Sequence, residues 1–315
     1  MRSPDPRDGT AADRSDDDRS SLLEQARHVW KRAVRRAAKW TRLAPAPTVP
    51  DVTRLGAPTD AIYAHRDLIV EVPLARCRYL YGGTFGPVHG EDPATSGWHP
   101  FVAVLHQWSA NPELRYEDSV LAEFYRRFQP RNQVEFLFPR DVAAAHADAA
   151  LARAPMGAGY APLVPWQLAL EPGSDRGEHG LGPEHGHQSF GPVSSAKGRT
   201  EFTRLRSTFV SIRDQGYQPT RAGREISGLF VLRGDDYRFV VRAGHHRMAA
   251  LAALGVATVR VGFFRQDPRA VNVEAVRTWP LVREGVFDEA LAVRFADQLF
   301  AEDQSWRGRD LGLVS

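Results

Sequence analysis

One run of the sequence, residues 239–264, is compatible with few arrangements other than a strand, a helix and a second strand in close succession. A short apolar pattern over 239–241 leads to Gly244, and an alanine-rich segment with helical spacing then ends at Gly255. A second apolar pattern follows over 259–264. This order predicts a strand–turn–helix–strand unit in which the glycine turn opens the helix.

The turn of this unit carries the sequence Gly244, His245, His246 and Arg247. The first N–H groups of a helix have no acceptor within the helix, and the helix dipole makes this end partly positive. Phosphate and carboxylate groups bind well there, and the three side chains would add donors. We therefore predict an anion-binding turn. In the alternative interpretation, both histidines only cap the helix and face solvent.

Periodicity predicts the remaining elements of the folded part. Helices are expected over 116–129, 141–153 and 200–215, with Phe202, Leu205, Phe209 and Ile212 inward, and one amphipathic helix is expected within 271–315. Strands are expected over 67–74, 134–138 and 228–232, and the last of these returns through a turn at 233–236 into 237–241.

Two sequence motifs in the C-terminal half of the chain resemble motifs of the ParB/sulfiredoxin-like superfamily. They are "LRSTFVSIRDQGYQP" at 205–219 and "GHHRMAALAALGVATVRV" at 244–261, with a predicted hairpin between them. The resemblance covers residues 197–265 and implies an α+β fold, a small mixed sheet with helices. It also implies that Gly244, His245, His246 and Arg247 hold nucleotide phosphates, with Gln218 close to the nucleotide. A second α/β-type region and an N-terminal amphipathic helix are expected to precede this fold.

The branches of the superfamily differ at positions that can be compared here. Sulfiredoxins carry a catalytic cysteine in this turn, where the present chain has His245, and Cys77 is distant in sequence. Partition proteins follow the domain with a DNA-reading helix-turn-helix, but few residues remain here and the net charge is only +3, which disfavours nucleic acid as a partner. A kinase branch resembles D-G-H-H-R, and Ala243 replaces its acid. The resemblance therefore implies a nucleotide site and leaves the chemistry open.

Other candidate site residues surround these motifs. Glu201, Asp214 and His246 are candidate catalytic groups, and Lys197 is a candidate phosphate contact. A solvated helix face is the alternative for Glu201 and Asp214. No metal site is predicted. The residues that could gather a metal ion lie in a glycine-rich loop, with no further ligand pair on a rigid element, and they are His179, Glu184, His185 and His187.

Composition shifts along the chain suggest its organisation. The predicted order is a disordered tail (1–20), a basic amphipathic helix (21–43), a proline-rich linker (44–59), an uncharacterised α+β region (60–171), a Gly/His-rich loop (172–196), the ParB/sulfiredoxin-like domain (197–270) and a C-terminal helix with a tail (271–315). The basic helix either lies on an anionic membrane surface or packs within the protein or on a partner. The single cysteine is expected to be buried and inert. It suits a cytoplasmic protein, peripheral to the inner face of the membrane if the basic helix binds lipid.

These observations predict a cytoplasmic nucleotide-binding protein. The first hypothesis is a small-molecule kinase that uses ATP, ADP or CTP, with Mg²⁺ as a further expected ion, and an unidentified small-molecule acceptor. The alternative is a non-catalytic, nucleotide-dependent switch or adaptor at the membrane surface.

Overall fold

A computed structural model describes residues 69–86, 97–154, 156, 162–167, 180–219, 225–263, 268–302 and 305–314. These residues belong to a single unit by their internal contacts. The predicted tail, basic helix and linker over 1–59 lie outside the described residues, and so does His179. Among the described helices, none has both the length and the apolar character needed to cross a bilayer.

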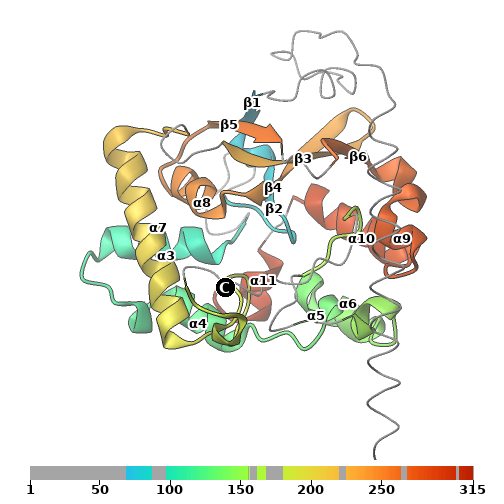
Figure 1. Cartoon of the computed structure of the whole chain (residues 1–315), viewed down its shortest axis with the longest axis horizontal. Helices are drawn as coiled ribbons and strands as arrows, with labels where there is room; N and C mark the ends of the chain where they lie inside the picture. The colour runs from blue at the N-terminus through green and yellow to red at the C-terminus, as the bar shows by residue number, and fades with distance from the viewer. Residues whose placement is uncertain are drawn as a thin grey trace, which may run out of the picture. The chain divides into compact units, whose positions relative to one another are not determined.

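The described residues contain a six-stranded mixed sheet, which lies in the upper part of Figure 1. Its strands are β1 (Val70–Pro73), β2 (Cys77–Tyr79), β3 (Ile226–Arg233), β4 (Asp236–Ala243), β5 (Thr258–Phe263) and β6 (Ala270–Asn272). The order is β1-β5-β3-β4-β2. Strands β5 and β6 both pair in parallel with β3, β5 with its first residues and β6 with its last. β3 and β4 form the predicted hairpin, whereas β2 runs parallel to β4. The fold class is α+β, which confirms the prediction at this level.

The sheet combines strands from both of the regions that the sequence suggested. β1 and β2 come from the region predicted at 60–171, whereas β3 to β5 come from the region predicted at 197–270. β1 pairs antiparallel with β5, and β2 places Cys77 opposite Phe239 of β4. Segments about 160 residues apart are therefore neighbours in one hydrogen-bonded sheet.

The position of Cys77 in this sheet confirms that it is an inert thiol. Its side chain is fully buried in β2, and its sulfur lies 3.7 Å from the carbonyl oxygen of Pro73. Burial raises the pKa of the Cys77 thiol to about 12, and the charge of Arg78 opposes that rise only in part. The thiolate needed for nucleophilic chemistry is therefore not formed at neutral pH.

Helices pack around the sheet (Figure 1). The α-helices are α3 (Pro100–Ala110), α4 (Val120–Arg127), α5 (Gln133–Leu137), α6 (Arg140–Ala145), α7 (Ser195–Gln215), α8 (His245–Ala253), α9 (Pro280–Arg283), α10 (Glu289–Phe300) and α11 (Trp306–Asp310). The 3-10 helices are η1 (Leu74–Arg76), η2 (Tyr116–Asp118), η3 (Ala150–Arg153), η4 (Pro183–His185) and η5 (Val273–Thr278). α8 packs against α7, α3 and β3, so its start lies where helices from both halves of the chain meet.

Helix α7 and the β4–α8–β5 unit agree with the sequence prediction. Ser194 caps α7 by accepting the N–H of Lys197 at 3.1 Å, and Gly216 ends the helix at φ 74°. The four predicted inward residues of α7 are all buried. α8 ends close to Gly255, which adopts φ 70°, and β5 follows as expected.

The prediction of a strand over 134–138 is wrong, because Gln133–Leu137 forms helix α5. A five-residue apolar run fits a buried strand and a buried helix equally well by periodicity. The cap decides between them here. The side chain of Asn132 accepts the N–H of Glu135 at 2.9 Å, which is the usual bond at a helix start.

Three further segments contain more helices than the sequence predicted. The single helix expected over 116–129 is divided into η2 and α4, because Ser119 caps a new helix there. The single helix expected over 141–153 is divided into α6 and η3. The last 45 residues contain the predicted amphipathic helix as α10, but also η5, α9 and α11. Helices of four to six residues make one or two turns, so they repeat too few positions to show a period.

Candidate active site

The turn that opens α8 has the geometry of an anion-binding helix start. Gly244 adopts the left-handed conformation, φ 97° and ψ 26°, and a Cβ there would lie 3.1 Å from Cγ1 of Ile226. Met248 N–H donates to the Gly244 carbonyl at 2.9 Å, so the three preceding N–H groups, those of 245–247, have no acceptor within the helix. Arg247 lies over the same turn, since its Nη2 is 3.0 Å from the position of that Cβ.

His245 does not extend from this turn toward a ligand, because its imidazole is turned into the protein. The ring is buried, and its Nε2–H donates to the carbonyl oxygen of Val241 at 3.0 Å. Burial lowers the pKa of His245 to about 4, although the hydrogen bond to Val241 favours the charged form. His245 is therefore neutral at physiological pH and anchors the start of α8 to the end of β4.

His246 points toward α7 and bonds to Glu201. Its Nε2 lies 2.7 Å from Oε2 of Glu201, and both side chains are buried. The other ring nitrogen, Nδ1, makes no hydrogen bond to the described residues. When the carboxylate accepts Nε2–H, Nδ1 carries the lone pair of the neutral imidazole. The pair therefore presents a carboxylate-oriented histidine at the first turn of α8.

The carboxylate of Glu201 is held by cations as well as by His246. Lys197 Nζ lies 3.2 Å from Oε1, one helical turn earlier on α7, and Arg204 Nη1 lies at the same distance from that oxygen. Burial alone would raise the pKa of Glu201. The hydrogen bond from His246 and the charges of His246, Arg204 and Lys197 outweigh burial and lower the pKa to about 2. Glu201 therefore stays ionised at physiological pH.

Aromatic residues of α3 and β2 position the two histidines. Phe101 stacks on the His246 ring with centroids 5.1 Å apart, and Tyr79 meets the His245 ring edge-on at 4.8 Å. His99 lies between these aromatic residues, 5.0 Å from Tyr79 and 5.2 Å from Phe101, and its Nδ1 accepts the Phe101 N–H at 3.2 Å. Burial, reinforced by the charges of neighbouring cationic groups, lowers the pKa of His99 well below its usual range.

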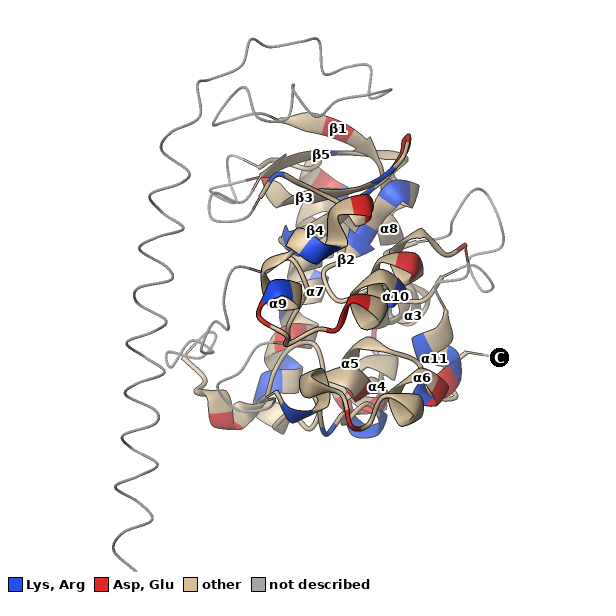
Figure 2. Cartoon of the chain, turned by 90° about the vertical axis from the view of Figure 1, so that its right-hand side faces the viewer, with Lys and Arg blue, Asp and Glu red and all other residues tan. Residues whose placement is uncertain are grey.

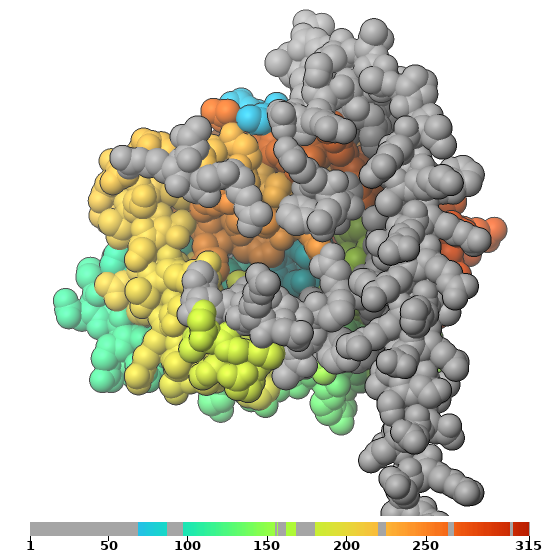
Figure 3. All heavy atoms as spheres, in the orientation of Figure 1, coloured from blue at the N-terminus to red at the C-terminus, as the bar shows by residue number. Residues whose placement is uncertain are grey.

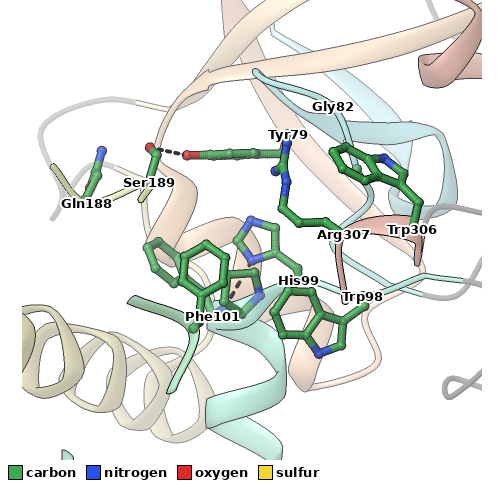
Figure 4. A pocket seen from close by; sticks show the side chains of 12 residues that line it. Tyr79, Gly82, Trp98, His99, Phe101, Gln188, Ser189, Trp306 and Arg307 are labelled. Atoms are coloured by element: carbon green, nitrogen blue, oxygen red, sulfur yellow. Dashed lines mark hydrogen bonds between the residues drawn. The ribbon is translucent and has the colours of Figure 1, made fainter. Parts of the chain in front are cut away.

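A small cavity of about 20 Å³, room for about one water molecule, lies beside these rings (Figure 4). Tyr79 and Ser189 share a hydrogen bond between their hydroxyl groups on one side of it, and His99 lines it from α3. The guanidinium of Arg307 enters from α11 and lies beside the Tyr79 side chain in Figure 4. Tyr79, His99, Ser189 and Arg307, from four separated segments, therefore meet around one small space whose wall is partly polar and partly aromatic.

The sequence did not indicate most of the residues around this small cavity. Tyr79, His99, Ser189 and Arg307 come from segments that carried no recognised motif. His99 followed by Pro100 resembles a helix start, with the cap residue before proline at the first helical position, and this signal was available. Nothing in the sequence near Arg307 indicates that it is buried.

Two predicted site residues lie at the far end of α7. Asp214 is exposed and bonds to Arg213 at 2.8 Å, which agrees with a solvated helix face rather than a catalytic group. Gln218 is exposed just beyond the helix and donates to the Gln215 carbonyl at 2.9 Å. Neither is joined by a described hydrogen bond to Glu201 or His246.

The histidine-rich loop stabilises the start of α7. His185 Nδ1 lies 2.8 Å from the hydroxyl of the cap residue Ser194, and Glu184 lies 3.6 Å from Nε2 of His185. His187 accepts the Ser189 N–H and stacks on Phe190. In the part of the chain that the structure describes, no three potential metal ligands come together. Figure 3 shows this loop, in yellow-green, next to the surface of α7.

No protein-family model, curated protein or solved structure matches this chain. The function is therefore argued from the geometry of the site.

Proposed function

We propose that this protein is a nucleotide-dependent phosphotransferase that acts on a small hydroxyl-bearing acceptor. The observation that carries the proposal is the pairing of His246 with Glu201 at the first turn of α8, whose first N–H groups have no acceptor within the helix. A base held by an ionised carboxylate, beside a helix start that suits phosphate, has the parts that phosphoryl transfer to a hydroxyl requires.

The start of α8 fits the phosphates of a nucleotide such as ATP, ADP or CTP. The left-handed Gly244 lets the backbone turn sharply, and the Arg247 guanidinium lies over that turn. Three N–H groups and one fixed cation would neutralise charge on a bound phosphate chain. His245 contributes by anchoring the turn and not by donating to the ligand, because its Nε2–H is used by Val241.

His246 serves as the general base in this proposal. Glu201 fixes the tautomer with the proton on Nε2, so Nδ1 accepts the proton of the acceptor hydroxyl as its oxygen bonds to phosphorus. The bond from phosphorus to the bridging oxygen breaks, and the shortened nucleotide leaves with that electron pair. Lys197 and Arg204 keep Glu201 ionised, which holds the imidazole in position through the reaction.

The described carboxylates near this turn do not fit Mg²⁺. Mg²⁺ binds through oxygen ligands with near-octahedral geometry. Both oxygens of Glu201 are paired with cations or His246, and those of Glu225 are bonded to Tyr217 and Arg260. These pairings leave neither carboxylate open to the ion.

Turnover and binding measured on matched variants test the proposal. Thermal shift with ATP, ADP and CTP would identify the nucleotide. A ligand at a concentration of 100 times its Kd raises the free energy of unfolding by about 2.7 kcal/mol. Release of the shortened nucleotide is then followed with pools of hydroxylated amino acids, sugars and polyols. We expect His246→Gln to lower turnover by about 100-fold or more while nucleotide binding is kept. Arg247→Ala should abolish the nucleotide-dependent stabilisation.

Control variants carry the same chemical changes at exposed positions. His106→Gln on α3 and Asp214→Asn on α7 should match the wild type in both assays, and Glu201→Gln should follow His246→Gln in turnover. Unchanged turnover in His246→Gln would remove the catalytic role. Unchanged nucleotide affinity in Arg247→Ala would remove the phosphate site.

A further inference from the structure

A second and much larger cavity lies at the end of the molecule formed by α4, α5, α6 and α11. Its volume is about 400 Å³, within the range of sites that hold small organic ligands. Its wall is formed by residues of α4, α5, α6 and α11 and of the segments that follow α4 and α6. None of them belongs to the Glu201–His246 pair or to the turn of α8.

The wall of this cavity combines apolar side chains with charged ones, of which most are cationic. The apolar part comprises Phe128, Phe138, Leu311 and three alanines of α6 and the residues after it. The charged part contains four arginines and two acids, and Figure 2 shows basic and acidic residues of α11 close to α6. An occupant that suits both parts has an apolar body and a negative charge.

Two of the four arginines are already neutralised. Arg127 and Arg131 form ion pairs with Glu123 and Glu135, and Arg127 also donates to the Leu311 carbonyl. The guanidinium of Arg140 is different. It makes no hydrogen bond or ion pair with the described residues, although its backbone N–H donates to Asp310.

Arg307 is a buried cation that forms no ion pair with the described residues, although the charge of Asp310 partly opposes the lowering of its pKa. Its exposed fraction is 9%, its Nη2 donates to the Phe136 carbonyl at 2.9 Å, and its Nε has no hydrogen-bond partner. Burial lowers its pKa to about 10, so it is still charged at neutral pH. An unpaired buried charge is costly, and an anion nearby would offset that cost.

We propose that this cavity binds a small organic carboxylate whose apolar body lies on the alanines of α6 and whose charge lies toward Arg140 and Arg307. The site is separate from the proposed phosphotransfer site, so either can be present without the other. Arg307 lines both this cavity and the small one beside Tyr79 and His99.

Calorimetric titration of the full chain with octanoate tests the proposal. Octanol, which has the same apolar body without charge, and acetate, which has the charge without the body, are the two comparison probes. We expect octanoate to bind at least tenfold more tightly than either. Arg140→Gln should weaken octanoate binding by only about fivefold, because an ion pair with an exposed charge contributes little to affinity. Ala144→Trp should abolish binding by filling the cavity.

Two matched variants separate the cavity from the general surface. Ala145→Trp places the same side chain on the neighbouring exposed position of α6, outside the wall, and Arg153→Gln removes an exposed arginine elsewhere. Both should bind octanoate like the wild type. Octanoate binding that survives Ala144→Trp, or equal binding of octanol and octanoate, would overturn the proposal whether or not the protein turns over nucleotides.

Discussion

His245 and His246 are adjacent in sequence but have different roles in the structure. Successive side chains of a helix point about 100° apart, so the two rings cannot face the same partner. His245 bonds back to Val241 of the preceding strand, whereas His246 reaches Glu201 on α7. Their type and spacing indicated a polar site at this turn. The direction of each ring depends on the positions of α7 and β4, which one local sequence does not show.

The burial of neutral His245 predicts a pH-dependent stability. Its pKa is about 4 in the folded protein and about 6.5 when unfolded, so the unfolded chain binds protons first as the pH falls. The contribution of neutral His245 to the free energy of unfolding is complete above pH 6.5. It falls by about 3 kcal/mol as the pH is lowered from 6.5 to 4. His99 adds to the same loss, because its pKa is also lowered. Urea unfolding at several pH values measures the slope.

His245→Gln tests this assignment, because glutamine can still donate to the Val241 carbonyl but does not titrate. The variant should lose less stability than the wild type between pH 6.5 and pH 4. His106→Gln, at an exposed position on α3, should keep the wild-type slope. Identical slopes in all three proteins would contradict the role of His245.

The candidate site could be predicted in part at the residue scale. Lys197, Glu201 and His246 were each named as candidate site residues, and the structure brings Lys197 and His246 together at the carboxylate of Glu201. Arg307 could not be found in this way. Its guanidinium packs over the rings of Phe128 and Phe136, which are 179 and 171 residues away in sequence.

At the scale of elements, the long helix α7 and the strands of the hairpin were predicted correctly, whereas the short helices were not. α7 has 21 residues, so its apolar positions repeat over nearly six turns, and its cap and end residues mark both boundaries. α5 has five residues, and its apolar run was mistaken for a strand. The signal that was missed is Asn132 followed three residues later by Glu135, which resembles a helix start.

The cap of α5 therefore has a measurable contribution. Asn132→Ala removes the acceptor for the Glu135 N–H, and we expect a loss of about 1 kcal/mol in the free energy of unfolding. Asn132→Asp keeps an acceptor at the same position and should lose much less. Urea unfolding of the two variants and the wild type gives the comparison. Equal losses in both variants would show that the cap bond does not stabilise α5.

At the scale of the whole molecule, the sheet joins segments that the sequence suggested as separate regions. Arg78 on β2 illustrates this connection. Its side chain is fully buried, and it donates to the Leu299 carbonyl of α10 at 2.8 Å and to the Ala75 carbonyl at 2.7 Å. β2 is therefore bonded to α10 through Arg78 and paired with β4 in the sheet. Pairing between distant strands leaves no local sequence signal.

This topology predicts that residues 197–270 do not fold alone. In such a fragment β4 would lose β2, β5 would lose β1, and buried residues such as Val240 and Val261 would lie next to exposed sheet edges. A fragment of about 70 residues also has little core to offset these losses. We expect the fragment to show no cooperative thermal transition by circular dichroism, whereas a chain of residues 69–315 should unfold in one transition that tryptophan fluorescence reports at the same temperature. A cooperative transition in the short fragment would show instead that the region resembling the ParB/sulfiredoxin-like superfamily is an autonomous domain and that β1 and β2 only extend its sheet.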